Sequence, residues 1–277
     1  MLSYQHSYHA GNFADVLKHV TLTRLLDYMT KKDKGLFYLE THSGRGLYDL
    51  KGPHALKTGE AKAGIERLWQ EKALPPVFSN YLQLIGNLNA DGDLRAYPGS
   101  PEIAIQMLRK QDRLFFSELH SGEFEQLSQL SKRGKRVVYS NTDGLSDLNA
   151  LLPPSERRGL VFIDPTYEVK TEYRDIPKLL KKSYKHFTGG TYCLWYPLVD
   201  KKHHEQLLRG LGGIETNDYL RCEFYQSTHP GLGMTGCGLW IINPPYVLAD
   251  ELHAINKVLC KLFNPGKSSY LIEKSPT

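Results

Sequence analysis

Short continuous runs of apolar residues alternate with stretches of helical periodicity along most of the chain. From Phe13 to Met29 apolar residues recur every three or four positions, which predicts a helix capped by Asn12. Continuous apolar runs are instead typical of strands that are buried on both faces of a sheet. Such runs predict parallel strands at 36–40, 112–117, 136–140, 159–163 and 190–196, with an antiparallel edge formed by 220–226 and 238–243. The pattern therefore predicts an α/β fold.

Residues 51–97 interrupt this alternation. Two amphipathic helical stretches, at 60–72 and 78–88, are joined by a Leu-Pro-Pro segment at 74–76, which predicts an inserted helical subdomain. The main domain would then comprise residues 1–50 and 98–277. The run Tyr-Pro-Gly-Ser-Pro at 97–101 leads into a predicted helix at 102–109, in which Ser100 either caps the helix or faces a ligand.

Composition and charge say little about the functional class of the protein. The chain has 277 residues with 35 Lys and Arg against 30 Asp and Glu, a net charge of +5 that is compatible with nucleic acid. Basic clusters at 132–136 and 178–185 are each either a solvated surface or a phosphate contact. The four cysteines lack metal-ligand spacing, and neither a spanning segment nor a signal peptide is evident. We expect a cytoplasmic protein without a metal site or membrane contact.

The stretch Gly159–Tyr167, G-L-V-F-I-D-P-T-Y, carries the most informative chemistry. Parallel sheets bind ligands beyond the carboxyl ends of their strands, which is where Asp164 is expected. The stretch resembles the D-P-P-Y motif of adenine-N6 and cytosine-N4 methyltransferases, with Thr166 in place of the second proline. The Asp164 carboxylate and the Pro165 carbonyl would accept the two amino hydrogens, and Tyr167 would stack on the base. The alternative is an ordinary Asp-Pro turn after a strand.

A second match at 243–246 follows the last predicted strand, and it fits the permitted N-P-P-Y form better than residues 164–167 fit D-P-P-Y. We favour Asp164 over Asn243, because the catalytic loop must lie on the strand next to the cofactor loop. Asn243 is then expected at the exit of an edge strand, where proline is tolerated.

Three further loops carry candidate cofactor contacts. Gly44 and Gly46, in T-H-S-G-R-G after the first strand, let the backbone approach a ligand, but a third glycine is absent and phosphate binding is not favoured. Glu118 ends the second strand, where a carboxylate suits two ribose hydroxyls. Asp143 and Gly144 follow the third strand, where an adenine amino group is read.

This order of features is typical of the class I (Rossmann-like) methyltransferase fold, which uses S-adenosylmethionine. Nearly the whole chain resembles the J type of bacterial large-subunit (23S) ribosomal RNA adenine-N6 methyltransferases. The resemblance rests on S-Y-x-H-S-x-H-A-G-N-x-A-D-V-L-K-H at 3–19, Y-P-G-S-P at 97–101, E-L-H at 118–120, R-R-G-L at 157–160, L-W-Y-P at 194–197 and G-M-T at 233–235.

The resemblance implies a role for particular residues. Those matching positions that contact S-adenosylmethionine are Lys18, His19, His42, Ser100, Glu118, Asp143, Gly144 and Asp164, and Asp164 also matches the catalytic position. Tyr4, in the N-terminal motif 1–11, matches an aromatic residue that touches the RNA substrate. The family acts on free 23S ribosomal RNA by flipping an adenine into the pocket. From its sequence context alone, His19 is equally well read as a half-buried histidine of the helix or, together with Lys18, as a side chain that points at an anion.

Two other functions stay open at this point. A DNA adenine-N6 methyltransferase would need a target-recognition region, for which only residues 51–97 are a candidate. A catalytically silent RNA-binding module would explain Thr166 as decay of the motif. We expect the protein to be a monomer.

Overall fold

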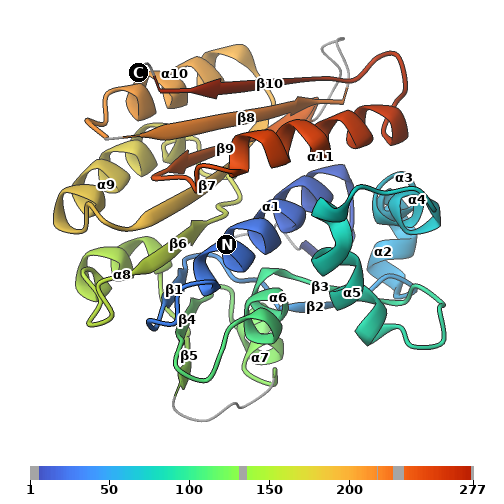
Figure 1. Cartoon of the computed structure of the whole chain (residues 1–277), viewed down its shortest axis with the longest axis horizontal. Coiled ribbons are helices and arrows are strands. Elements are labelled where there is room, and N and C mark those ends of the chain that lie inside the picture. Colours follow the sequence, from blue (N-terminus) through green and yellow to red (C-terminus); the bar gives the residue numbers. More distant parts are fainter. Residues whose placement is uncertain (1–5, 131–135, 217, 227–233, 276–277) are drawn as a thin grey trace.

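A computed structural model describes residues 6–130, 136–216, 218–226 and 234–275. Its centre is a sheet with the strand order β10-β8-β9-β7-β6-β1-β4-β5 (Figure 1). The parallel strands are β1 (Phe37–Glu40), β4 (Arg113–Ser117), β5 (Val137–Ser140), β6 (Gly159–Ile163) and β7 (Thr191–Leu198). The antiparallel edge consists of β8 (Tyr219–Tyr225), β9 (Gly236–Ile242) and β10 (Ser269–Lys274). The strands predicted from the apolar runs are confirmed, whereas β10 was not predicted.

Strand β6 shows why a continuous apolar run forms the middle of this sheet. All five of its residues are buried. Leu160 and Phe162 face one hydrophobic core, while Val161 and Ile163 face the other. Because successive side chains of a strand point to opposite faces, an inner strand needs apolar residues at every position.

Helices cover both faces of the sheet (Figure 1). The first core is covered by α1 (Phe13–Thr30), α6 (Ser100–Met107), α7 (Ser121–Leu127) and α11 (Leu248–Leu262). The second is covered by α8 (Gly144–Leu151), α9 (Glu172–His186) and α10 (Lys201–Gly212). The predicted cap of α1 is confirmed, because the Asn12 side chain accepts a hydrogen bond from the Asp15 N–H. This arrangement brings the loops after β1, β4, β5 and β6 to one edge of the sheet.

The segment 51–97 leaves and rejoins the main chain through a two-stranded ribbon, β2 (Leu47–Asp49) paired with β3 (Ala96–Pro98). Between them lie α2 (Pro53–Thr58), α3 (Glu60–Ala63), α4 (Ile65–Gln70), η2 (Pro76–Phe78) and α5 (Ser79–Leu88), and a short η1 (His6–Tyr8) precedes α1. The first predicted stretch is broken at Gly64, where a Cβ would lie 2.1 Å from the Gly11 carbonyl oxygen. Apolar residues of α4 and α5 join the same core as α1. Residues 51–97 therefore share the core of the N-terminal helix, and their description as an inserted subdomain stays a prediction.

Candidate active site

A cavity of about 840 Å³ opens at the carboxyl edge of the parallel strands. Its walls come from η1 and α1 and from the loops after β1, β4, β5, β6 and β7. Among the residues that line it are Lys18, His19, His42, Gly44, Ser100, Glu118, Asp143, Gly144, Asp164, Pro165 and Tyr167. The structure thus gathers the sequence-predicted site residues in one place, apart from Tyr4, which lies outside the described residues.

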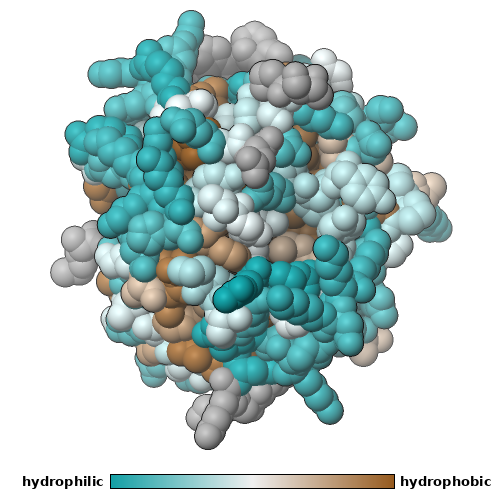
Figure 2. All heavy atoms as spheres, turned by 60° about the vertical axis from the view of Figure 1, so that its left-hand side comes forward, coloured by the Kyte–Doolittle hydropathy of each residue, from teal (hydrophilic) through white to brown (hydrophobic). Residues whose placement is uncertain are grey.

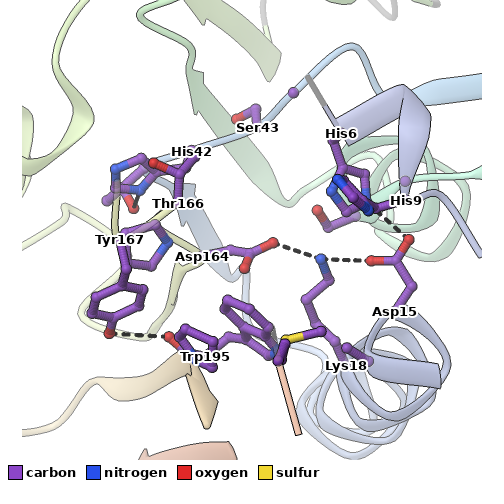
Figure 3. A pocket seen from close by; sticks show the side chains of 18 of the residues that line it. His6, His9, Asp15, Lys18, His42, Ser43, Asp164, Thr166, Tyr167 and Trp195 are labelled. Carbon is purple, nitrogen blue, oxygen red and sulfur yellow. Dashed lines mark hydrogen bonds and ion pairs between the residues drawn. The ribbon is translucent and has the colours of Figure 1, made fainter. Parts of the chain in front are cut away.

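Asp164 is held by an ion pair that crosses the cavity from helix α1 (Figure 3). The Lys18 ammonium lies 2.6 Å from Asp164 Oδ2 and 2.8 Å from Asp15 Oδ1. Burial opposes the charge of Lys18, but Asp15 and then Asp164 outweigh it and keep the pKa of Lys18 well above its usual value. Asp15 in turn contacts His6 Nε2 at 2.8 Å and accepts the Gly11 N–H. The N-terminal motif therefore sets the position of the acidic side chain in the Asp-Pro loop.

Tyr167 ends this loop in a left-handed backbone conformation, with φ of 54°. Its ring is 2 % exposed and lies 4.4 Å from the Tyr173 ring, and its hydroxyl donates to the Trp195 carbonyl at 3.3 Å. The Lys18 Nζ lies over the Trp195 ring, 5.8 Å from the ring centroid. Aromatic side chains thus form the base of the cavity beside Asp164, and stacking of a substrate base on Tyr167 stays a prediction.

Glu118 lies at the end of β4 with its carboxylate fixed from two sides. Oε2 accepts the Gly44 N–H and Oε1 accepts the His120 N–H, both at 2.7 Å. Burial raises the pKa of Glu118, and the two backbone donors only partly offset this effect. Each carboxylate oxygen keeps a second lone pair, so the group can still accept hydrogen bonds from a pair of hydroxyls.

Close backbone approach explains two of the glycines at the site. Gly44 has φ of 60°, and a Cβ there would lie 2.5 Å from the Tyr48 hydroxyl. A Cβ on Gly144 would lie 2.2 Å from the Thr41 carbonyl oxygen, so the loops after β5 and β1 touch at this point. Asp143 caps α8 by accepting the Leu145 N–H at 3.0 Å. Neither Gly44 nor Gly144 therefore leaves room for a side chain.

Two neighbouring histidines are uncharged, and His19 is buried whereas His42 is half-buried. His42 Nδ1 pairs with the Thr41 hydroxyl, and burial lowers the pKa of His42 to about 4. His19 pairs with the Tyr97 hydroxyl at 2.8 Å, and burial lowers its pKa to about 3. The sequence suggested that His19 points at an anion, but a neutral imidazole is a hydrogen-bonding group, not a cation. Its contact with the cofactor stays a prediction.

The predicted capping role of Ser100 is wrong. Gly99 is the N-cap of α6, and Ser100 is the first helical residue. Its hydroxyl donates to Glu40, which is fully buried at the end of β1 and has its pKa raised by burial to about 8. Ser100 still lines the cavity, as the alternative interpretation required.

The second motif lies away from the cavity, as expected, but the expectation that it leaves an edge strand is wrong, because β9 pairs with both β7 and β8. Strand β9 is antiparallel to β7 and pairs Ile242 with Tyr192, so its carboxyl end is at the opposite edge of the sheet. The Asn243 amide donates to the carbonyls of Thr188 and Gly190 at 2.7 Å. Asn243 is not among the described residues that line the cavity. Its side chain instead closes the turn that precedes β7.

Several residues of the site were not singled out in the sequence. Asp15 pairs with Lys18, and Glu40 accepts the Ser100 hydroxyl. Tyr97 pairs with His19, and the Trp195 carbonyl accepts the Tyr167 hydroxyl. Asp15 follows the cap of α1 by three residues and precedes Lys18 by three, which was the available signal for an ion pair. The other contacts join residues far apart along the chain and leave no local pattern.

The residues present fit S-adenosylmethionine. The fixed Glu118 carboxylate at the end of β4 suits a ribose diol. The cavity also includes Gly44 and its neighbours in the loop after β1. In this loop Ser43 is 3 % exposed, and its hydroxyl has no partner among the described residues. A buried hydroxyl of this kind needs a hydrogen-bonding partner, which the polar groups of a methionine moiety can supply.

Residues 6–130, 136–216, 218–226 and 234–275 contain no group of three or more His, Cys, Asp or Glu side chains that could hold a metal ion. Within the same ranges, every helix is too short or too polar to cross a membrane.

Known proteins resemble the chain over nearly its full length. Ribosomal RNA large subunit methyltransferase J of Haemophilus influenzae is 42% identical over 276 residues, covering 99% of this chain and 98% of the relative. The protein of that name from Escherichia coli K12 is 40% identical over 256 residues, covering 92% and 91%.

Solved structures agree with this relationship. A crystal structure of a Legionella pneumophila protein has a TM-score of 0.91 and 52% identity, covering 96% of this chain and 98% of that one. A probable spermidine synthase from Corynebacterium glutamicum, with a TM-score of 0.53, 11% identity and coverage of 96% and 77%, shows the fold alone. The class I methyltransferase fold predicted from the sequence is confirmed. The family model for Ribosomal RNA large subunit methyltransferase D, RlmJ matches residues 33–273, and the chain belongs to this family.

Proposed function

We propose that the protein transfers a methyl group from S-adenosylmethionine to N6 of an adenine in 23S ribosomal RNA. Membership of the family supports the RNA substrate, and the acceptors of the Asp164 loop support the amino group as the target. The substrate is free RNA whose target adenine is flipped into the cavity.

The observation that carries this proposal is the position of Asp164 and Pro165 in the cavity wall. An exocyclic amine conjugated with its ring is a poor nucleophile, so its lone pair must be localised before it attacks. The Lys18 ammonium donates a hydrogen bond to Asp164 Oδ2, and no described residue donates one to Asp164 Oδ1. Oδ1 and the Pro165 carbonyl can then accept the two hydrogens of the amine. Lys18 orients this acceptor, since Asp15 fixes its ammonium from the other side.

The remaining residues divide between the cofactor and the base. S-adenosylmethionine supplies an electrophilic methyl group on a positively charged sulfur. Glu118 binds the ribose hydroxyls, Asp143 reads the adenine amino group of the cofactor, and the loop with His42 and Gly44 holds the methionine part. Tyr167 provides a ring face for the flipped base, because aromatic stacking compensates for the stacking lost from the RNA.

One assay separates this function from its alternatives. Purified protein is incubated with labelled S-adenosylmethionine and with protein-free 23S RNA, 16S RNA or duplex DNA, and the methylated base is mapped by mass spectrometry. We expect label in adenine N6 of 23S RNA only. Preferential methylation of DNA would establish the DNA enzyme, and cofactor binding without transfer to any nucleic acid would establish a silent RNA-binding module.

A further inference from the structure

We propose that the RNA next to the target adenine runs along helix α9 and the start of α10, on a row of exposed cations that begins at the mouth of the cavity. The inference rests on the proposed function, since it assigns a path to the substrate of that site. We call this row the α9 stripe, and it consists of Arg174, Lys178, Lys182 and Lys185.

Helical spacing places the four cations of the α9 stripe on one face. They follow one another at intervals of four, four and three residues, and all are exposed. The opposite face of α9, with Tyr173, Ile176 and Leu180, is buried against the sheet. With a rise of about 1.5 Å per residue, the stripe extends roughly 16 Å from Arg174 to Lys185. This length spans several successive phosphates of an RNA strand.

The stripe starts where the cavity ends. Glu172 and Tyr173, in the first turn of α9, line the cavity. Val199 lines it too, and Lys201 and Lys202 follow at the exposed start of α10. Both helices therefore lead from the mouth of the cavity across the same side of the molecule (Figure 1).

Helices α9 and α10 form one continuous surface. A Cβ on Gly210 would lie 2.7 Å from the Pro177 side chain, so the two helices are in close contact. The Lys181 ammonium donates to the Gly213 carbonyl at 3.0 Å and joins the end of α10 to α9. Figure 2, in which this side of the molecule comes forward, shows mostly hydrophilic residues with hydrophobic ones between them.

The segments on the other side of the cavity are less basic than α9 and α10. Residues 117–129, which include α7, carry Glu118, Glu123 and Glu125 and contain no Lys or Arg, although Glu123 is paired with Arg45 from the loop after β1. Residues 141–151, which include α8, carry Asp143 and Asp147 and again contain neither. In contrast, residues 168–213 contain nine Lys and Arg against five Asp and Glu, a net charge of +4 out of +5 for the chain. A polyanion that enters the cavity is therefore attracted toward α9 and α10.

Internal ion pairs do not neutralise the stripe. Asp175 pairs with Arg174 at 2.8 Å and with Lys178 at 3.6 Å. Lys182 and Lys185 form no ion pair with any described residue. A cationic helix face is often only a solvated surface. Here its start at the cavity and the lower basic charge of the segments with α7 and α8 favour a phosphate contact.

The test compares two triple variants with equal loss of charge. Lys178→Gln, Lys182→Gln and Lys185→Gln together remove most of the stripe. The control replaces Lys257, Lys261 and Lys267, which are exposed on and just after α11, by glutamine. Affinity for a 23S RNA fragment is measured by fluorescence anisotropy over a range of salt concentrations, and affinity for S-adenosylmethionine is measured by calorimetry.

We expect the stripe variant to bind the RNA about tenfold more weakly or worse at moderate salt, with unchanged affinity for S-adenosylmethionine. Because each phosphate contact contributes about 0.7 to 0.9 to the slope of log affinity against log salt, that slope should decrease by about 2. The control should keep nearly the wild-type slope. An unchanged slope in the stripe variant, or an equal decrease in the control, would overturn the proposed path.

These outcomes are distinct from failure of the proposed function. A wild-type protein that binds the RNA through the stripe but transfers no methyl group would refute the enzymatic proposal and leave the path intact. A wild-type protein that methylates 23S RNA, together with a stripe variant of normal affinity and salt slope, would refute the path alone.

Discussion

Replacing Glu118 by alanine should weaken the binding of S-adenosylmethionine without unfolding the protein. In the structure both carboxylate oxygens accept backbone N–H groups, from Gly44 and from His120. The carboxylate is thus already oriented before a ligand binds, and Glu118 lines the cavity. Alanine removes both the charged acceptor and the tie between the loops after β1 and β4.

The magnitude follows from the bonds that are lost. A hydrogen bond to a charged group contributes roughly 1.5 to 3 kcal/mol, and two ribose hydroxyls share this carboxylate. A loss of about 1.4 kcal/mol changes a dissociation constant tenfold. We therefore expect a dissociation constant raised at least about tenfold and by as much as about a hundredfold.

The Glu118→Gln variant makes the prediction sharper. Because each carboxylate oxygen faces a backbone donor, the amide nitrogen of glutamine must face the N–H of Gly44 or of His120. Two donors then oppose each other, so glutamine should rescue little of the lost affinity. Burial raises the pKa of Glu118 above 4.5. The wild-type affinity should accordingly fall as the pH falls through this raised value, whereas the affinity of the alanine variant should depend less on pH.

Calorimetric titration with S-adenosylmethionine measures these constants directly. Glu125→Ala is the matched control, because Glu125 is exposed on α7 and its loss changes the net charge equally. Circular dichroism confirms that each variant is folded. A folded Glu118→Ala protein whose dissociation constant stays within twofold of the wild-type value would refute a ribose contact at this position.

Three further changes test other parts of the site. Asp164→Ala should abolish methyl transfer while Asn243→Ala keeps most of it, as measured by single-turnover rates on saturating RNA; a dead Asn243 variant would show that the wrong loop was chosen. Burial raises the pKa of Glu40 from 4.5 to about 8, so the folded state binds this proton more tightly than the unfolded state. The free energy of unfolding should therefore fall as the pH rises from 4.5 to about 8, by up to about 1.4 kcal/mol per pH unit. Urea titrations should show that Glu40→Gln removes this dependence. Thr166→Pro should retain or modestly raise turnover at unchanged cofactor affinity, because proline would confine Pro165 to extended angles; collapse of activity in the folded variant would mark threonine as a specific adaptation.

The positions of the site loops could be predicted from the sequence because parallel strands impose them. Each buried apolar run ends in a polar residue, such as Glu118 after β4 or Asp164 after β6. The carboxyl ends of parallel strands meet at one edge, so local patterns were enough to bring these residues together. The outer strand β10 was missed because its residues alternate in burial and carry Glu273 and Lys274, without a continuous apolar run.

The partners of the site residues could not be predicted in the same way. Lys18 and Asp164 are 146 residues apart, and their ion pair depends on how α1 packs across the end of β6. The pairing of His19 with Tyr97 likewise depends on how α1 packs beside β3. These contacts set which groups are charged. A residue can therefore be placed at the site from its sequence context while its protonation state follows only from the packed structure.

The two similar tetrapeptides show how topology decides what a motif can do. D-P-T-Y and N-P-P-Y both follow a fully buried strand, and both contain one residue with positive φ. In the first that residue is Tyr167, whose aromatic ring is turned under the cavity, whereas in the second it is Asn243, whose amide closes a turn. The difference arises from strand direction: β6 runs parallel to β1, and β9 runs antiparallel to β7. Since the proposed cofactor loop follows β1, only a motif at the end of a strand parallel to β1 can face it. The better match to a sequence pattern is therefore the one that does not line the cavity.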